Sequence, residues 1–256
     1  MDEVLLAHTD GPVRTLTLNR PAARNALSSE LIGRLAAGLA EAEADEGVAA
    51  VILTGADPAF CAGLDLREVG AGRIDLDLVL DPARSPWWVL GAMRTPVIGA
   101  VNGPAITGGL ELALQCSFLV ASERAVFGDT HARVGVHPGG GLTGLLPQAV
   151  GLRRAREMSF TGNLLNAAEA HRLGLVNHVV SHEELLPTAQ RLAVDIAAAD
   201  GPTVRALNET YRDVAGLPLG EGFELERRRF AAWGLPAEEV DRRRADVTGR
   251  GRSQLG

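Results

Sequence analysis

The chain has 256 residues, of which 46% are hydrophobic and 22% charged, and it carries a formal net charge of −7 at pH 7. Its 25 basic side chains are all arginine, so it has no lysine to serve as a Schiff-base nucleophile, a pyridoxal-phosphate anchor or a P-loop residue. The net negative charge argues against a nucleic-acid-binding protein, which presents a basic face.

The N-terminal segment predicts a hairpin followed by a helix. Residues 4–8 and 13–18 are strand-like and are joined by a turn at Asp10-Gly11. Residues 28–46 repeat apolar side chains at helical spacing, and Ser28 is available as the N-cap.

The next elements predict an α/β fold with parallel strands. The apolar run 49–54 is typical of a strand buried on both faces, and 97–101 has the same character. Between them, residues 67–85 have no clean period and predict a mobile loop or short helices, followed by a helix at 86–93. Two more short strands are expected at 118–121 and 125–127, and the chain beyond about residue 141 is expected to be mainly helical.

Asp200-Gly201-Pro202 is the best candidate for a boundary, because glycine and proline together stop a helix. We therefore expect a core at 1–200 and a helical C-terminal region at 201–256. From residue 221 onward eight arginines face seven acids, which favours salt-bridged helical surfaces over a basic patch.

Several features indicate the compartment. The two cysteines, Cys61 and Cys116, suggest a reducing environment, and the N-terminus has no basic stretch followed by an apolar run. No run of 18 uninterrupted apolar residues occurs. We expect a cytoplasmic protein that binds neither membranes nor nucleic acid.

Two sequence patterns favour ordinary structural interpretations. Gly139, Gly141 and Gly144 form a G-x-G-x-x-G pattern, but Pro138 precedes them and no acid follows at the distance that a dinucleotide site requires. His178 and His182 lack a matching cluster of cysteines or carboxylates, so no metal site is expected.

Two loops carry the functional signal, because both follow buried strands where parallel sheets bind ligands. They are residues 60–66, Phe-Cys-Ala-Gly-Leu-Asp-Leu, and residues 102–113. Gly108 and Gly109 allow close approach of a ligand, and the helix that starts there leaves its first N–H groups free to stabilise an oxyanion.

With two further segments, these loops resemble the enoyl-CoA hydratase/isomerase (crotonase) superfamily over about residues 4–180. The matching motifs are Asn19-Arg20-Pro21 with Arg24-Asn25-Ala26-Leu27, then Phe60 to Leu66, then Asn102-Gly103 to Ala113, then Phe127-Gly128 with Gly135 to Gly141. The resemblance implies a crotonase-like spiral of ββα units and a helical C-terminal region that forms homotrimers or dimers of trimers. It also implies an acyl-CoA thioester substrate, with coenzyme A as part of the substrate and no bound prosthetic group.

The resemblance assigns roles to individual residues. The backbone N–H groups of Leu64 and Gly108 match the family's oxyanion hole, and Glu111 matches the first of two catalytic glutamates. The carbonyl of Ala62 matches a contact to adenine. The positions of Asp65, Leu66 and Arg67 match the substrate path.

The chain departs from the family pattern at the second glutamate, where it has His131. An imidazole can relay a proton near neutral pH, so His131 is a candidate replacement. Asp129 is a minor candidate for an alternative carboxylate. On a strand, residues two positions apart point the same way and lie ~7 Å apart, which would separate Asp129 from His131. A second departure is the C-terminal tail, which lacks the family's usual Lys-Arg-x-Pro-x-Phe-like ending.

The leading hypothesis is an enoyl-CoA hydratase that adds water to a 2-enoyl-CoA. The alternatives are double-bond isomerisation or other enolate chemistry such as dehalogenation or decarboxylation, and a non-catalytic acyl-CoA-binding protein. With no lysine in the chain, the CoA phosphates must be bound by arginine, and Arg24 and Arg67 are the candidates. The paired Trp87 and Trp88 predict either a wall of the acyl tunnel or an interface.

Overall fold

The structure, a computed structural model, describes residues 3–255, without the side chains of residues 246 and 253–255. It begins with the expected hairpin of β1 (Leu5–Asp10) and β2 (Val13–Leu18), in which Asp10 pairs with Val13. A 3-10 turn, η1 (Pro21–Ala23), leads to α1 (Ser29–Ala44). The Ser28 hydroxyl accepts a hydrogen bond from the Leu31 N–H at 3.3 Å, which confirms the predicted N-cap.

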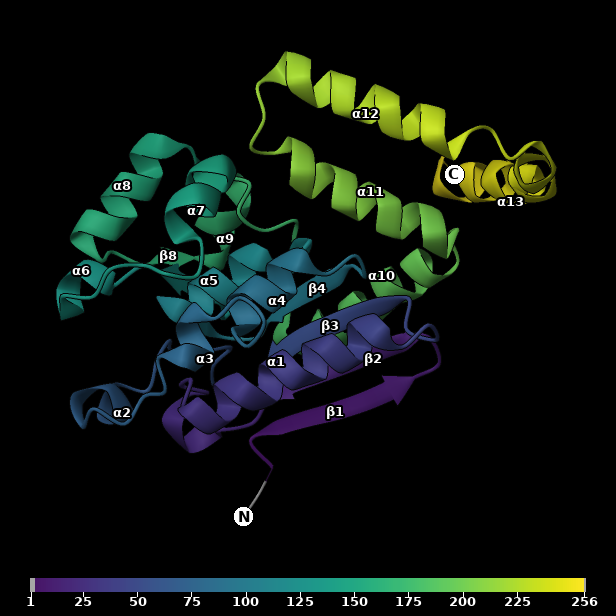
Figure 1. The fold of residues 1–256 in the computed structure, drawn as a ribbon. Helices are drawn as coiled ribbons and strands as arrows, with labels where there is room; N and C mark the ends of the chain where they lie inside the picture. The colour runs from purple at the N-terminus through teal and green to yellow at the C-terminus, as the bar shows by residue number, and fades with distance from the viewer. Residues whose placement is uncertain (1–2, 256) are drawn as a thin grey trace. The chain divides into compact units, whose positions relative to one another are not determined.

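A six-stranded sheet forms the centre of the N-terminal part (Figure 1). Its strand order is β1-β2-β3-β4-β6-β9, where the last four strands are β3 (Ala50–Gly55), β4 (Val97–Val101), β6 (Phe118–Ser122) and β9 (His178–Val180). Every pair after the hairpin is parallel. The carboxyl ends of β3, β4 and β6 therefore meet at one edge.

Both faces of the sheet are covered, as expected for a parallel sheet. On β3, Val51 and Leu53 join the cluster that includes the buried face of α1, while Ala50 and Ile52 pack on the other side. The helix on that second side is α10 (Leu185–Ala197), which contacts β3, β4 and β6. All six residues of β3 are buried, which confirms the interpretation of this run.

A second, three-stranded sheet contains one expected strand, since the run 125–127 corresponds to β7, but its other two strands were not predicted from the sequence. It has the order β5-β7-β8, with β5 (Pro104–Ile106), β7 (Val126–Gly128) and β8 (Leu165–Asn166). Strands of two or three residues are too short to show an alternating pattern. The sheet places the chain after β4 beside the chain after β6.

Short helices connect these strands. The unpatterned segment 67–85 contains α2 (Leu66–Gly70) and α3 (Asp77–Leu80), in line with the alternative of short helices. The other helices of this part are α4 (Pro86–Ala92), α5 (Gly108–Gln115), α6 (His131–Val134), α7 (Leu142–Val150), α8 (Leu152–Thr161), α9 (Ala167–Arg172) and the 3-10 turn η2 (His182–Glu184).

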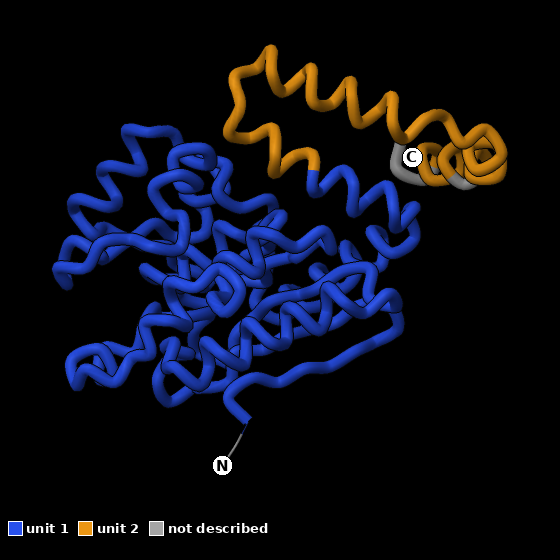
Figure 2. The backbone as a smooth tube through the Cα atoms, in the orientation of Figure 1, with its two compact units in different colours: residues 1–209 blue, residues 210–256 orange. Residues whose placement is uncertain are grey.

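The chain divides into two compact units, Met1–Glu209 and Thr210–Gly256 (Figure 2). The division falls inside α11 (Gly201–Val214), whereas the sequence placed a boundary at the start of this helix. The second unit continues with α12 (Leu219–Trp233) and α13 (Ala237–Leu255). Within the described residues, no helix combines the length and apolar character needed to cross a membrane.

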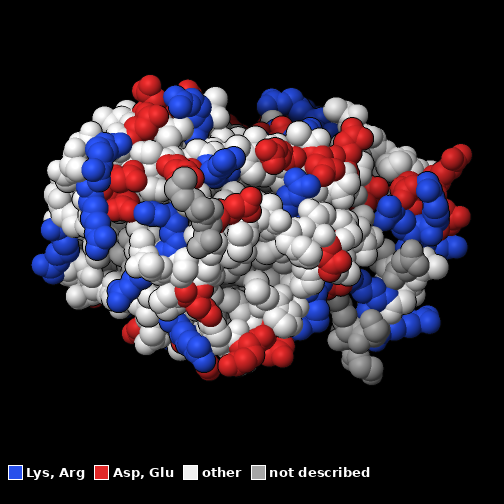
Figure 3. Space-filling model, turned by 90° about the horizontal axis from the view of Figure 1, so that it is seen from below, with Lys and Arg blue, Asp and Glu red and all other residues white. Residues whose placement is uncertain are grey.

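The C-terminal helices carry local ion pairs, as the sequence predicts. Arg227 and Arg228 both pair with Glu224, and Arg242 and Arg243 both pair with Glu239. On the face of the molecule seen in Figure 3, arginine and acidic side chains are interspersed and uncharged surface lies between them.

Candidate active site

Two backbone bridges bring the functional loops together at the carboxyl ends of the central strands. The Cys61 N–H donates to the Pro104 carbonyl at 3.0 Å, and the Ile106 N–H donates to the Cys61 carbonyl at 2.9 Å. A second bridge pairs Leu27 with Leu64. The loop 60–65 is thus held between β5 and the chain that precedes α1.

These bridges leave two amide groups without a partner. The Leu27 N–H and carbonyl bond to Gly63 and Asp65, so the N–H of Leu64 points away from this bridge. Gly108 begins α5, where helix geometry supplies no acceptor for its N–H. Neither N–H has an acceptor among residues 3–255.

The close approach of the two loops depends on glycine. A Cβ atom on Gly63, which has φ +89°, would lie 3.3 Å from the Gly108 nitrogen. A Cβ atom on Gly109 would lie 2.1 Å from the Cys61 carbonyl oxygen. Thr107, between these segments, has φ 54°, an uncommon conformation for a residue with a side chain and one that is concentrated at functional sites.

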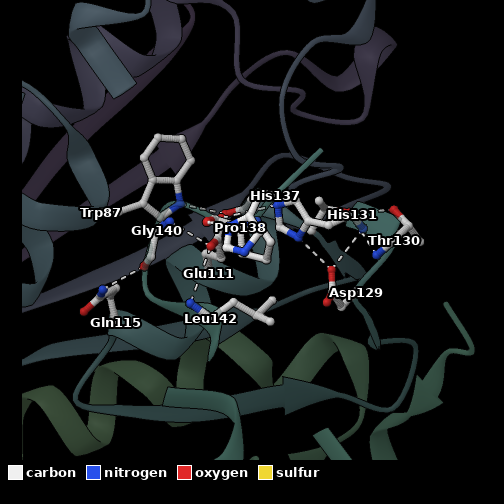
Figure 4. Close-up of polar contacts among 12 residues, drawn as sticks. Trp87, Glu111, Gln115, Asp129, Thr130, His131, His137, Pro138, Gly140 and Leu142 are labelled. Atoms are coloured by element: carbon white, nitrogen blue, oxygen red, sulfur yellow. Dashed lines mark hydrogen bonds and ion pairs between the residues drawn. The ribbon is translucent and has the colours of Figure 1, made fainter. Parts of the chain in front are cut away.

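Glu111 lies in the first turn of α5 and is only 3% exposed. Its Oε1 accepts hydrogen bonds from the N–H groups of Gly140 at 2.8 Å and Leu142 at 3.4 Å (Figure 4). Burial raises the pKa of Glu111 above its ordinary value, and the Gly140 hydrogen bond and the nearby His131 offset part of this rise. Its Oε2 has no hydrogen bond to the described part of the chain.

His131 and Asp129 lie beside Glu111 (Figure 4). The His131 Nε2 is 3.8 Å from Glu111 Oε2, and its Nδ1 is 2.7 Å from Asp129 Oδ1. The expected separation of ~7 Å between Asp129 and His131 is wrong, because that distance assumes a continuous strand. Strand β7 ends at Gly128 and His131 starts α6, so the chain turns and the two side chains meet.

A cavity of about 300 Å³ opens onto Glu111 and His131. Leu64, Gly108, Glu111, His131, Ala62 and Leu66 all line it, so the structure brings six of the nine predicted site residues together. Much of the remaining lining is aliphatic and comes from Val69, Ile74, Leu76, Val79, Leu80, Val134 and Val136. Trp87 also lines the cavity and donates from Nε1 to the Gly108 carbonyl at 2.9 Å, whereas Trp88 is 46% exposed.

The other three predicted residues, Arg24, Asp65 and Arg67, do not line this cavity. Asp65 is largely buried, forms a 2.9 Å ion pair with Arg20 and caps α2 through the Arg67 N–H. Burial opposes its ionisation, but these partners lower the pKa of Asp65 overall. Within the structure Asp65 therefore supports the loop.

Arg24 and Arg67 are exposed, and their guanidinium groups have no ion pair or hydrogen bond within the described chain. The Arg24 carbonyl accepts a hydrogen bond from the Ala62 N–H at 3.1 Å, so Arg24 lies next to the Ala62 loop. Both cations are available at the surface.

Sequence reasoning missed Gly140 and the cavity-lining His137, and it misplaced Asp129. Trp87 lines the cavity, in line with one of the two alternatives predicted for the tryptophan pair. Gly140 and His137 lie within the motif from Gly135 to Gly141, which could have indicated them. The contacts of Trp87 with Gly108 depend on how α4 packs on α5, and no local pattern encodes this packing.

The glycines and histidines for which the sequence predicts a structural role take part in the local structure. Gly141 precedes α7 as its N-cap. His182 contacts Asp57 and Ser122, and His178 lies on β9. Among the described residues, no three His, Cys, Asp or Glu side chains form a group that could hold a metal ion.

Comparisons with known proteins agree with this architecture. A family model described as enoyl-CoA hydratase/isomerase matches residues 8–239. A protein named probable enoyl-CoA hydratase from Rhizobium meliloti (strain 1021) is 41% identical over 228 residues, which are 89% of this chain and 88% of that protein.

Solved structures show the same fold. The crystal structure of enoyl-CoA hydratase from Mycobacterium tuberculosis H37Rv has 53% identity and a TM-score of 0.77, over 88% of this chain and 96% of that one. The crystal structure of enoyl-CoA hydratase from Bacillus anthracis has 33% identity and a TM-score of 0.82, over 88% of this chain and 89% of that one. The chain belongs to the enoyl-CoA hydratase/isomerase family and has the crotonase fold.

The contact between Gly109 and Cys61 can be tested by substitution. In Gly109→Ala the added methyl group meets a backbone oxygen that cannot move freely, so we expect a loss of about 3 kcal/mol in the free energy of unfolding. Urea denaturation followed by circular dichroism measures it. Gly144→Ala is the matched control, because that helical glycine has open space around it and alanine should be neutral or stabilising by up to about 1 kcal/mol. Equal stability of the two variants would contradict this account.

Proposed function

We propose that this protein is an enoyl-CoA hydratase, a lyase that adds water across the α,β double bond of a 2-enoyl-CoA thioester. The observation that carries the proposal is the placement of a buried carboxylate, Glu111, in the same cavity as the free N–H groups of Leu64 and Gly108. The names of the relatives support the same reaction.

The two N–H groups provide an oxyanion hole. Attack on the β-carbon moves electrons onto the thioester oxygen, and donors already aimed at that oxygen stabilise the enolate. One such donor is worth ~3 to 4 kcal/mol of barrier in other enzymes. The reaction needs no prosthetic group, because coenzyme A enters as part of the substrate.

Glu111 is suited to act as the base. Gly140 and Leu142 hold one of its oxygens, which leaves Oε2 to take a proton from the attacking water. The burial that raises the pKa of Glu111 makes this carboxylate a stronger base than an exposed glutamate. His131, whose Nε2 lies 3.8 Å from Oε2, is the proposed donor of the proton that the α-carbon receives.

Glu111→Gln tests this role. The amide fills the same space but cannot accept the proton, so we expect kcat to fall by about 10²- to 10⁴-fold with little change in CoA-ester binding. In the wild type, kcat should fall as the pH drops through the raised pKa of Glu111, which places the acid limb above the range of an ordinary glutamate.

The assay follows loss of the enoyl absorbance of crotonyl-CoA and longer 2-enoyl-CoA esters. Glu30→Gln, an exposed glutamate in the first turn of α1, is the matched control and should keep full activity. Turnover of 3-enoyl esters alone would indicate an isomerase, and tight binding without turnover would indicate an acyl-CoA-binding protein. Unchanged turnover in Glu111→Gln would refute the assignment.

The proposal extends to the nucleotide part of the substrate. Arg24 and Arg67 flank the loop 60–66, and both present unpaired guanidinium groups that can bind the CoA phosphates. The carbonyl of Ala62, in the same loop, is the proposed acceptor for adenine.

The double variant Arg24→Ala/Arg67→Ala separates phosphate binding from catalysis. We expect KM for crotonyl-CoA to rise roughly tenfold, and KM for crotonyl-pantetheine, which lacks the nucleotide, to stay the same. Arg34→Ala, an exposed arginine on α1, serves as the control. An equal change for both thioesters would show that these arginines do not bind the nucleotide.

We also propose that residues 201–256 assemble the chain into trimers or dimers of trimers. Support comes from large apolar side chains that α12 leaves exposed, with Phe223 at 63%, Phe230 at 59% and Trp233 at 50%. Single exposed apolar residues are ordinary, but several on one helix are typical of an interface.

Sedimentation equilibrium tests the assembly. The wild type should sediment as three or six copies, and Phe223→Glu/Phe230→Glu should form smaller species because it buries charge in the proposed interface. Leu152→Glu, an equally exposed leucine on α8, is the control. A monomeric wild type would contradict the proposal.

A further inference from the structure

A buried carboxylate and imidazole form a pair next to Glu111. Asp129 is 1% exposed and His131 is 6% exposed. One oxygen, Asp129 Oδ1, contacts His131 twice, at 2.7 Å to the ring Nδ1 and at 3.1 Å to the backbone N–H. The position of the ring is therefore determined by Asp129.

The ionisation of Asp129 decides which ring nitrogen carries a hydrogen. Burial opposes ionisation, but the contacts with the His131 ring, the Ser159 side chain and the His131 backbone outweigh it and lower the pKa of Asp129. A carboxylate only accepts hydrogen bonds, so Nδ1 must be the donor. The other nitrogen, Nε2, is then the one that faces Glu111 Oε2 at 3.8 Å.

We propose that Asp129 is a positioning residue that keeps a hydrogen on His131 Nδ1 and directs Nε2 at the substrate, so that His131 delivers the second proton of the reaction. This inference rests on the proposed hydratase function. It assigns to His131 the proton transfer that a second glutamate would otherwise perform. The same logic relates the aspartate and histidine of serine-protease triads.

The proton balance of the step is complete. The water oxygen bonds to the β-carbon and its proton moves to Glu111 Oε2, while the imidazolium transfers its Nε2 proton to the α-carbon. The electrons of the double bond form the new bond to this proton. A proton then passes from Oε2 to Nε2 and restores both groups, while Asp129 stays ionised throughout and stabilises the charged ring.

A second observation indicates that Asp129 does more than hold the local turn. Its other oxygen, Oδ2, is buried and has no partner within hydrogen-bonding distance among the described residues, although the Ser159 side chain lies near enough to help lower the pKa of Asp129. A buried oxygen of this kind costs free energy, and a turn that needed only one acceptor could use a smaller residue. The free-energy cost of burying Asp129 Oδ2 is explained if the negative charge of Asp129 serves the reaction.

Asp129→Asn tests the proposal, because asparagine keeps the shape and loses the charge. We expect kcat to fall by at least about 10- to 100-fold, the scale seen when the hydrogen-bond partner of a metal-ligating histidine is removed, with little change in KM. In the His131→Gln background the same change should have no further effect, because Asp129 acts through His131. A fall of equal size in both backgrounds, or no fall in the wild type, would overturn the proposal.

A readout independent of activity is the tautomer of His131. In protein labelled with ¹⁵N-histidine, the signals absent from His131→Gln identify this residue. At a pH high enough for the ring to be neutral, they should show the hydrogen on Nδ1 in the wild type and a shift towards Nε2 in Asp129→Asn. An unchanged tautomer in Asp129→Asn would overturn the inference, whatever the change in kcat.

The chain contains a matched control in the exposed pair of Asp57 and His182, where Asp57 Oδ2 lies 3.0 Å from Nε2. Asp57→Asn should alter only the His182 signals and leave kcat unchanged. If the wild type hydrates no 2-enoyl ester, the proposed function fails, and the tautomer measurement still decides whether Asp129 positions His131.

Discussion

The close contact between the loop 60–65 and the start of α5 is the constraint on which the site depends. The Cys61 carbonyl lies where a side chain on residue 109 would be, so only glycine allows the helix to begin there. This contact sets Gly108 and Leu64 beside each other with their N–H groups free. It also fixes the direction of α5, and therefore places Glu111 in the cavity three residues later.

Burial of Glu111 has a cost and a chemical consequence. Removing a carboxylate from water disfavours its charge, and the N–H groups of Gly140 and Leu142 return only part of the lost hydration. The result is a carboxylate with one oxygen held and the other available as a base. A Cβ on Gly140 would lie 3.0 Å from the Glu111 carboxyl carbon, so this arrangement also requires glycine at position 140.

Much of the fold was predictable because it follows local patterns. The hairpin, the Ser28 cap and the doubly buried β3 each have a clear periodicity or turn signal. The motifs also predicted that Leu64, Gly108, Glu111 and His131 share a site. Of the sheet β5-β7-β8 only β7 was expected, because β5 and β8 are too short to show a period. The contact between Asp129 and His131 was missed because it depends on a turn after Gly128 that has no sequence signal of its own.

Isotope labelling with the wild-type protein shows whether the cavity adds water to an enoyl thioester. The measurement is mass spectrometry of the product formed from crotonyl-CoA in water enriched in ¹⁸O and deuterium. We expect one ¹⁸O atom on the β-carbon and one deuterium on the α-carbon. Deuterium without ¹⁸O, or an unlabelled ester recovered from a tight complex, would contradict it.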